Sequence, residues 1–212
     1  MKNIKLNTFE EDMQSQQGKH LEFYLEQVSS SIMTVHIDQE ILEPAYYRQV
    51  VQGIENLSDG DQLTFNIASP GGRLDGLEVV LSAIKNTDAI VIANIAGSCH
   101  SAASILALNC DMIYVSPHAS MLVHFVSFGS VGASNHVLKQ AEHTKKVSEK
   151  LFRDTYQYFL TEEEIERCIE DDFQLWLDAD QITERLEVRQ ECQKEYQEAL
   201  QRQLQEELDN QD

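Results

Sequence analysis

Two kinds of hydrophobic pattern follow one another along the first half of this chain. Three runs rich in β-branched or apolar residues predict strands at 31–37, 63–68 and 89–96. The last run is almost wholly apolar, which is typical of a strand buried on both faces of a sheet. Between the runs, apolar residues recur at helical spacing over 50–57 and 74–84. This alternation of strand and helix predicts an α/β fold with right-handed crossovers and a parallel core.

The second half begins with a run of small residues that predicts a helix over 101–108. Two further apolar runs predict strands at 112–115 and 121–126. A long polar helix is expected from Ser134, and its apolar stripe is narrow. Such a helix often projects from its domain and packs against another subunit. From Glu187 onward, a sequence rich in Glu and Gln predicts a solvated terminal helix.

These patterns divide the chain into three parts. Residues 1–20 are polar and are expected to form a flexible arm. Residues 21–188 are expected to fold as one domain that includes the long helix, at about 134–158. Residues 189–212 form an acidic, helical C-terminal tail in this interpretation.

Composition narrows the classes of function. The 212 residues are 42% hydrophobic, enough for a large core, and we find no run that predicts a membrane span or a signal peptide. The formal net charge of −20 argues against nucleic-acid binding, because phosphate contacts need Lys and Arg. The excess of acidic residues either keeps the protein soluble or lets the C-terminal tail bind a basic partner. Four cysteines without CxxC or metal-like spacing predict reduced thiols, a cytoplasmic protein and no metal or other cofactor.

The candidate chemistry lies where the apolar strand 89–96 ends. Ser101 stands at the junction with the next helix, so its hydroxyl is expected near the positive end of that helix. Upstream, the glycine pair of Ser69–Gly72 offers backbone N–H groups with no side chain in the way. Serine hydrolases need both a positioned hydroxyl and such donors. Cys99 is expected to be a small buried filler rather than a nucleophile.

A serine nucleophile needs a base, and the base needs an acid that orients it. His124 is the best candidate for the base, because it lies in the apolar run 121–126, where a charged side chain would be unfavourable. Periodicity alone favours the interpretation of His124 as a neutral histidine packed in the core. Its position after a serine corner instead favours a role as the catalytic base. For the acid we prefer Asp172 and then Asp171, although a pair of aspartates also suits an ordinary surface loop.

Four segments of the chain, taken together, resemble a known family. They are Ser69-Pro70-Gly71-Gly72, the run Gly97–Ala103 around the serine, Leu122-Val123-His124, and Ile165-Glu166-Arg167 ahead of the two aspartates. Their order and spacing are similar to those of the proteolytic subunit of the Clp protease family (ClpP), in a divergent or phage-borne form. The resemblance runs from about Ser31 to Val188.

This resemblance implies a fold and a set of roles. The fold would be a ClpP/crotonase-like core of repeated β-β-α units, with a projecting handle helix and, here, an extra C-terminal helix. Ser101 would be the nucleophile, His124 the general base and Asp172 the orienting acid. The backbone N–H groups of Gly72 and Ala102 would form the oxyanion hole. The activity implied is that of a serine endopeptidase, a protease that hydrolyses peptides through an acyl-enzyme.

The resemblance also implies an assembly. Family members form homo-oligomers of stacked rings, commonly of seven subunits, that meet through the handle helix. The serines then face an inner chamber, where polypeptide substrates are cleaved. An AAA+ unfoldase feeds such a chamber in the family. Here Thr64 and Asn66 stand where the family has its docking aromatics, which argues against docking of the usual kind.

Three alternatives stay open at this point. His100 stands just before Ser101, where the family has a small residue, and a one-residue slip would give an inactive ring subunit with a scaffold or regulatory role. An acyl-CoA enzyme of the crotonase superfamily would share the core and the oxyanion hole, although basic contacts for CoA phosphates are sparse in this chain. About two extra residues near Asp172, relative to the family pattern, leave the choice of acid open.

Overall fold

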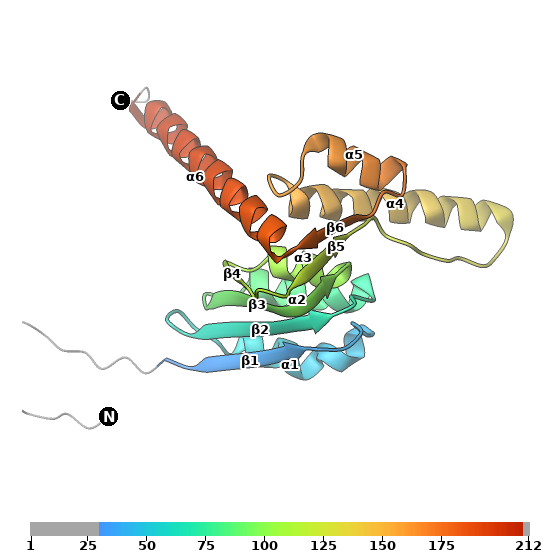
Figure 1. The fold of residues 1–212 in the computed structure, drawn as a ribbon, viewed down its shortest axis with the longest axis horizontal. Coiled ribbons are helices and arrows are strands. Elements are labelled where there is room, and N and C mark those ends of the chain that lie inside the picture. The colour runs from blue at the N-terminus through green and yellow to red at the C-terminus, as the bar shows by residue number, and fades with distance from the viewer. Residues whose placement is uncertain (1–29, 210–212) are drawn as a thin grey trace, which may run out of the picture.

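The structure is a computed structural model that describes residues 30–209 (Figure 1). The expected arm, residues 1–20, lies outside the described residues. Within residues 30–209, no helix has the length and hydrophobicity needed to cross a membrane. The elements follow one another in this order: β1 (Ile32–Ile37), the 3-10 helix η1 (Pro44–Tyr47), α1 (Arg48–Glu55), β2 (Gln62–Ser69), α2 (Leu74–Lys85), β3 (Ile90–His100), α3 (Ala102–Leu108), β4 (Met112–Val115), β5 (Ser120–Val123), α4 (Ser134–Tyr156), α5 (Glu162–Glu170), β6 (Leu175–Asp178) and α6 (Ala179–Asp209).

A six-stranded sheet forms the centre of the fold, in the spatial order β1-β2-β3-β5-β6. β1, β2 and β3 are parallel neighbours. The long strand β3 pairs in parallel with β4 along its first half and with β5 along its second half. These pairings confirm the predicted parallel core. β6 runs antiparallel to β5, and the sequence patterns did not predict this strand.

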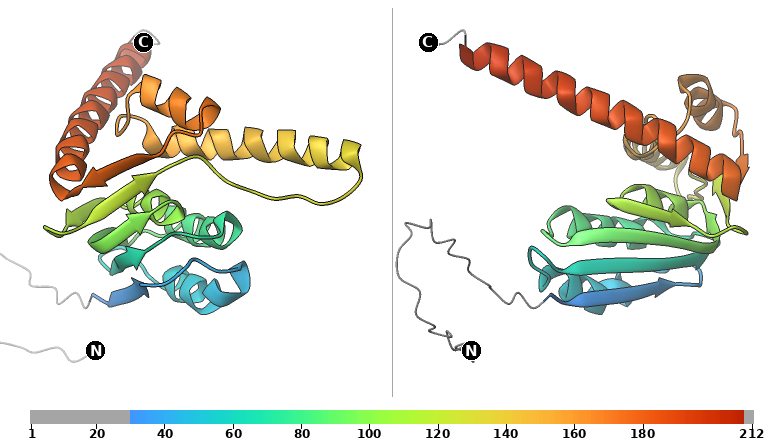
Figure 2. Two further views of the ribbon diagram at one scale, coloured as in Figure 1. Left: turned by 45° about the vertical axis from the view of Figure 1, so that its right-hand side comes forward. Right: turned by 60° about the vertical axis from the view of Figure 1, so that its left-hand side comes forward.

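Helices α1, α2 and α3 cover one face of the sheet and leave the other face open (Figure 2). On the covered face, the side chains of Leu63, Phe65 and Ile67 in β2 are fully buried. On the open face, Thr34 and His36 of β1 are exposed. Burial of the apolar face against the helices supplies the main driving force for folding, and it fixes which way each strand residue points.

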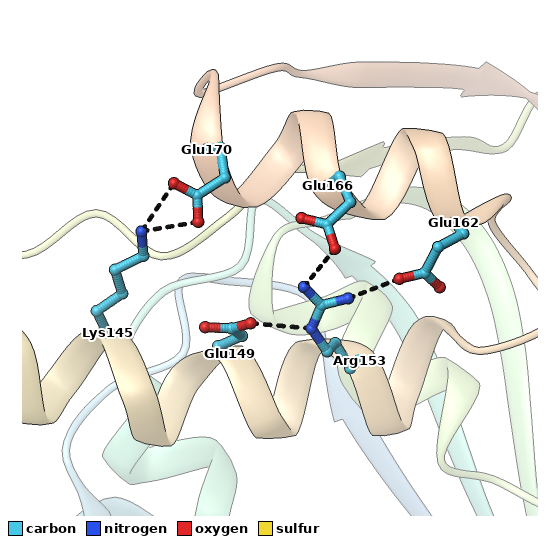
Figure 3. Close-up of polar contacts among 6 residues, drawn as sticks. All are labelled: Lys145, Glu149, Arg153, Glu162, Glu166 and Glu170. Carbon is cyan, nitrogen blue, oxygen red and sulfur yellow. Dashed lines mark hydrogen bonds and ion pairs between the residues drawn. The ribbon is translucent and has the colours of Figure 1, made fainter.

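Helix α4 projects from the domain, and α5 lies beside it (Figure 1). Ion pairs join two basic residues of α4 to three glutamates of α5: Arg153 to Glu162 and Glu166, and Lys145 to Glu170 (Figure 3). The N–O distances are 2.8, 2.8 and 2.9 Å. Each pair is partly solvated and adds little stability alone, but together they fix α5 along one side of α4.

Helix α6 is continuous across residues 188 and 189, where the sequence patterns suggested a domain boundary. Its first turns pack against the rest of the fold, and the remainder extends away (Figure 1). Arg189 Nη2 donates a 2.9 Å hydrogen bond to the Leu108 carbonyl oxygen at the C-terminus of α3. Arg185 donates to both carboxylate oxygens of Glu164 in α5, at 2.7 and 2.9 Å. The helix is therefore joined to both α3 and α5.

Two strands end three or more residues away from their predicted ends. β3 continues through Gly97 to His100, so that Ser101 follows the strand directly. β5 ends at Val123, which makes His124 the first residue after the strand. β5 ends at Val123 because it has no strand partner beyond that residue. β3 stops at His100, and β6 begins opposite Val123.

Candidate active site

Ser101 has an uncommon backbone conformation at the junction of β3 and α3. Its φ is 54° and its ψ is −125°. Such a conformation costs an L-residue on the order of 1–3 kcal/mol, and it is found mainly where surrounding contacts enforce it. The Ser101 N–H donates to the Leu122 carbonyl oxygen over 2.8 Å, which extends the β3–β5 pairing by one residue. Ser101 is the N-cap residue of α3, at the positive end of this short helix.

The glycine segment after β2 contacts this serine. A Cβ added to Gly71, whose φ is 91°, would collide with the carbonyl oxygen of His100 and lie 2.8 Å from the Cβ of Ser101. The buried Ser69 hydroxyl holds the segment: it donates to the Gln39 carbonyl oxygen over 2.6 Å and accepts from the Gly71 N–H over 3.1 Å. Glycine is therefore required at position 71 both for its φ and for the close approach to the serine corner.

A cavity of about 240 Å³ opens beside Ser101. Four of the residues singled out from the sequence line it: Gly72, Ser101, Ala102 and His124. The rest of its wall is mainly apolar: Leu74, Ile105, Phe125, Val126, Leu151 and Phe152, with Ser127 and Ser148. The rings of Phe125 and Phe152 pack edge to face, with their centroids 5.7 Å apart.

His124 is half-buried at this cavity rather than enclosed in the core. Its position follows from the Ser101–Leu122 hydrogen bond, because Leu122 lies only two residues before it. Across residues 30–209, no hydrogen bond joins the Ser101 hydroxyl to the imidazole of His124. The two side chains therefore share the cavity without direct hydrogen bonding.

Two backbone N–H groups, those of Gly72 and Ala102, belong to residues that line the cavity. Among the described residues, neither the Gly72 N–H nor the Ala102 N–H donates a hydrogen bond. Ala102 is the first residue of α3, where N–H groups have no helical acceptor. Gly72 lies beside Ile41, which instead bonds to Gly71 and Arg73, at 2.7 and 2.8 Å. Two unengaged donors beside a hydroxyl match what stabilisation of an oxyanion requires.

The two candidate acids lie outside the cavity. Asp171 is the C-cap residue of α5, Asp172 follows with a φ of 53°, and both are exposed. The turn that holds them leads into β6, whose first residue, Leu175, pairs with Val123 next to His124. Extended chain from Asp172 to Leu175 spans about 10 Å at most. The acid therefore lies at the same end of the β5–β6 pair as the histidine, and its role stays a prediction.

The residues just before Ser101 do not line the cavity. His100 Nε2 lies 3.0 Å from the Ser120 hydroxyl oxygen, and its ring packs edge to face on Trp176 at 5.1 Å. Burial lowers the pKa of His100, which favours the neutral ring. Cys99 is fully buried, as predicted, and burial raises the pKa of its thiol, so a thiolate is disfavoured. The geometry thus favours Ser101 over both neighbours as a nucleophile.

Sequence patterns missed the contribution of α4 to this site. Ser148, Leu151 and Phe152 supply one wall of the cavity, and the only signal in the sequence was the narrow apolar stripe that contains the last two. Within the described part of the chain, no group of three or more His, Cys, Asp or Glu side chains could hold a metal ion.

A serine at a strained strand-to-helix corner, with a histidine and free N–H donors around one cavity, is the arrangement found in serine hydrolases. Comparison with known families makes the class more specific: the Clp protease family model matches residues 20–185. The match covers most of the chain, so this protein belongs to the Clp protease family, as the resemblance of its motifs predicted. A search of curated proteins finds no match.

Proposed function

We propose that this protein is a serine endopeptidase with Ser101 as its nucleophile and His124 as its general base. The proposal rests on one observation: Ser101 and His124 line the same cavity as Gly72 and Ala102, whose backbone N–H groups donate no hydrogen bond among the described residues. Membership of a family of serine peptidases that act on polypeptides supports it. A hydrolase of this kind needs no cofactor.

In the proposed reaction, the Ser101 oxygen attacks the carbonyl carbon of a peptide bond while its proton passes to the His124 imidazole. The N–H groups of Gly72 and Ala102 stabilise the negative charge that develops on the carbonyl oxygen. The imidazolium then gives its proton to the departing amine, and an acyl-enzyme ester remains. Water attacks this ester, and His124 accepts one of its protons and returns it to the serine oxygen. The product leaves as a carboxylic acid, which ionises to a carboxylate by releasing its proton to the solvent.

Asp172 is the proposed orienting acid, with Asp171 as the alternative. An acid of this kind stabilises the imidazolium and holds the ring in one orientation. Because both aspartates stand at the turn before β6, we expect this turn to move toward His124 in the active enzyme. Both aspartates are exposed, so their side chains could move toward His124 with little loss of packing.

The cavity wall indicates the kind of peptide that would be cleaved. Phe125, Val126, Leu151 and Phe152 present apolar surface within reach of Ser101. We therefore propose that an apolar side chain of the substrate occupies the cavity next to the bond that is cut. Burial of such a side chain is worth about 1.5–3 kcal/mol, enough to give a clear preference over a charged residue.

We further propose the assembly that the family likeness implies: a crotonase-like core, with α4 as the handle helix between stacked rings, commonly of seven subunits. α4 is 23 residues long and exposes Leu138 and Val147, with 60% and 48% of their surfaces accessible. An AAA+ unfoldase would need an unusual docking surface, since Asn66 is polar and accepts a 3.0 Å hydrogen bond from Asn94. The division into arm, domain and tail and the cytoplasmic location also stay proposals.

Hydrolysis of a fluorogenic peptide with an apolar residue before the cleavage site tests the proposed function. Ser101→Ala should abolish hydrolysis, and His124→Ala should reduce it by a factor on the order of 10³ or more. Ser98→Ala is the matched control, because Ser98 is exposed three residues upstream and should not matter. Hydrolysis that survives in Ser101→Ala would refute the assignment. A wild-type chain that assembles but never cleaves would instead be an inactive ring subunit.

A further inference from the structure

We infer that Tyr156, at the C-terminal end of α4, acts through Ser104 to position the nucleophile. This inference rests on the proposed function of Ser101. Both hydroxyl-bearing side chains are fully buried, and their oxygens lie 2.6 Å apart. The Ser104 hydroxyl lies 2.7 Å from the carbonyl oxygen of Ser101 itself. A continuous line of hydrogen bonds therefore runs from α4 to the backbone of the nucleophile.

Counting protons fixes the direction of this hydroxyl relay, defined as Tyr156–Ser104–Ser101. The Ser101 carbonyl oxygen can only accept, so Ser104 must donate its single proton to it. The Tyr156 hydroxyl must then donate to the Ser104 oxygen. The opposite direction would leave the buried Tyr156 proton without a partner, at a cost of about 1–3 kcal/mol. Burial raises the pKa of Tyr156, so its hydroxyl keeps this proton across the working range of pH.

The relay meets the nucleophile at a point where support is needed. Ser101 holds its φ of 54° only because its surroundings enforce it. Its carbonyl oxygen also accepts the Ser104 N–H over 2.9 Å. The Ser104 hydroxyl lies 3.4 Å from the carbonyl oxygen of Leu122, the same atom that accepts the Ser101 N–H. Ser104 thus contacts both the serine backbone and the strand that leads to His124.

The same end of α4 forms part of the substrate cavity. Phe152, one turn before Tyr156, lines the cavity, and the centroids of the Phe152 and Tyr156 rings lie 4.5 Å apart. A displacement of this end of α4 would therefore move the cavity wall and the relay together. Tyr156 acts through Ser104 and does not line the cavity, so it is a positioning residue rather than a catalytic one.

The test is the rate at which a fluorophosphonate labels Ser101, measured with kcat and KM for a peptide. Tyr156→Phe keeps the ring and removes only the hydroxyl. Ser104→Ala removes the middle hydroxyl of the relay, and alanine is favourable in the alanine-rich helix α3. This variant therefore tests the inference even if Tyr156→Phe folds poorly. Tyr196→Phe, at an exposed position on α6, is the control. Circular dichroism confirms that each variant is folded.

We expect Ser104→Ala to slow labelling and kcat about tenfold, and Tyr156→Phe several-fold, with KM nearly unchanged. The double variant should be no slower than Ser104→Ala alone, because both changes break one relay. Wild-type rates in folded Tyr156→Phe and Ser104→Ala, or a change confined to KM, would overturn this inference and leave the proposed function intact. A wild-type protein that is not labelled at Ser101 would overturn the proposed function itself.

Discussion

Gly71 and Ser101 meet at the serine corner, and the contact between them leaves no room for a side chain at position 71. We predict that Gly71→Ala destabilises the fold by about 2–4 kcal/mol, because a Cβ there is both strained at its φ of 91° and in collision with the His100 carbonyl. The control is Gly60→Ala. Gly60 has a similar φ of 86° but nothing within 4 Å of the added atom.

Urea denaturation of the two glycine variants separates strain from collision. Gly60→Ala should lose only about 1–2 kcal/mol of the free energy of unfolding, the cost of the left-handed conformation alone. Gly71→Ala should also lose fluorophosphonate labelling. If Gly60→Ala and Gly71→Ala lose the same free energy of unfolding, the close approach of Gly71 to Ser101 adds nothing to the cost of a side chain there.

At single positions, the sequence could predict residue types but not all of the partners. Ser101, His124, Gly72 and Ala102 were identified by motif, and they line one cavity. The Tyr156–Ser104 hydrogen bond could not be foreseen, because it joins residues 52 positions apart and neither stands out in its own segment. Hydroxyl partnerships of this kind depend on tertiary packing, which no local pattern encodes.

At the scale of elements, the contact between α5 and α6 depends on one shielded ion pair. Glu164 accepts two hydrogen bonds from Arg185, and the side chains are only 19% and 26% exposed. The hydrogen bond and charge of Arg185 lower the pKa of the Glu164 carboxyl. A group with a lowered pKa stabilises the fold above its unfolded pKa, near 4.5, and loses this contribution as the pH falls through the folded value.

We predict that Glu164→Gln lowers the free energy of unfolding by about 1–3 kcal/mol at pH 7, because the amide keeps the shape but not the charge. The difference from wild type should shrink as the pH falls from 5 toward 3, where the wild-type carboxylate also becomes protonated. Glu162→Gln is the control: its pair with Arg153 is 74% exposed on the glutamate side and should matter little at either pH. A deficit for Glu164→Gln that is the same at pH 7 and pH 3 would contradict this account.

Most elements could be predicted from periodicity, and the exceptions share a physical cause. Apart from the C-terminal end of β3, β1 to β4 and the helices from α1 to α4 lie close to their predicted positions, because their apolar or small residues form continuous runs or recur at helical spacing. β6, at Leu175–Asp178, was not predicted, because its strand conformation depends on pairing with the edge of β5, and a local pattern does not reveal that pairing. The position of Asp172 depends on the same short strand, which is why sequence alone could not place the acid.

At the scale of the whole molecule, α4 carries apolar residues that the single chain leaves uncovered. Leu138 is 60% exposed, and the neighbouring Lys139 is exposed as well. We predict that the purified protein sediments as a large oligomer and that Leu138→Asn shifts it toward smaller species. The reason is that contact with another subunit would remove the Leu138 side chain from water, and Leu138→Asn would take away this favourable contribution.

Lys139→Asn is the matched control for this experiment, since it places the same residue one position along the same helix. Sedimentation velocity at several protein concentrations gives the size distribution of each variant. If both variants sediment like wild type, or if wild type is a monomer at every concentration, α4 is not the contact that the proposed assembly requires.

The most direct test of the central claim is to react the wild-type protein with a fluorophosphonate and to locate the adduct by peptide mass spectrometry. The account predicts one adduct, on the Ser101 oxygen, that is lost in Ser101→Ala and strongly reduced in His124→Ala. An adduct on another residue, or equal labelling of wild type and His124→Ala, would contradict the assignment of Ser101 and His124 as a nucleophile and its base.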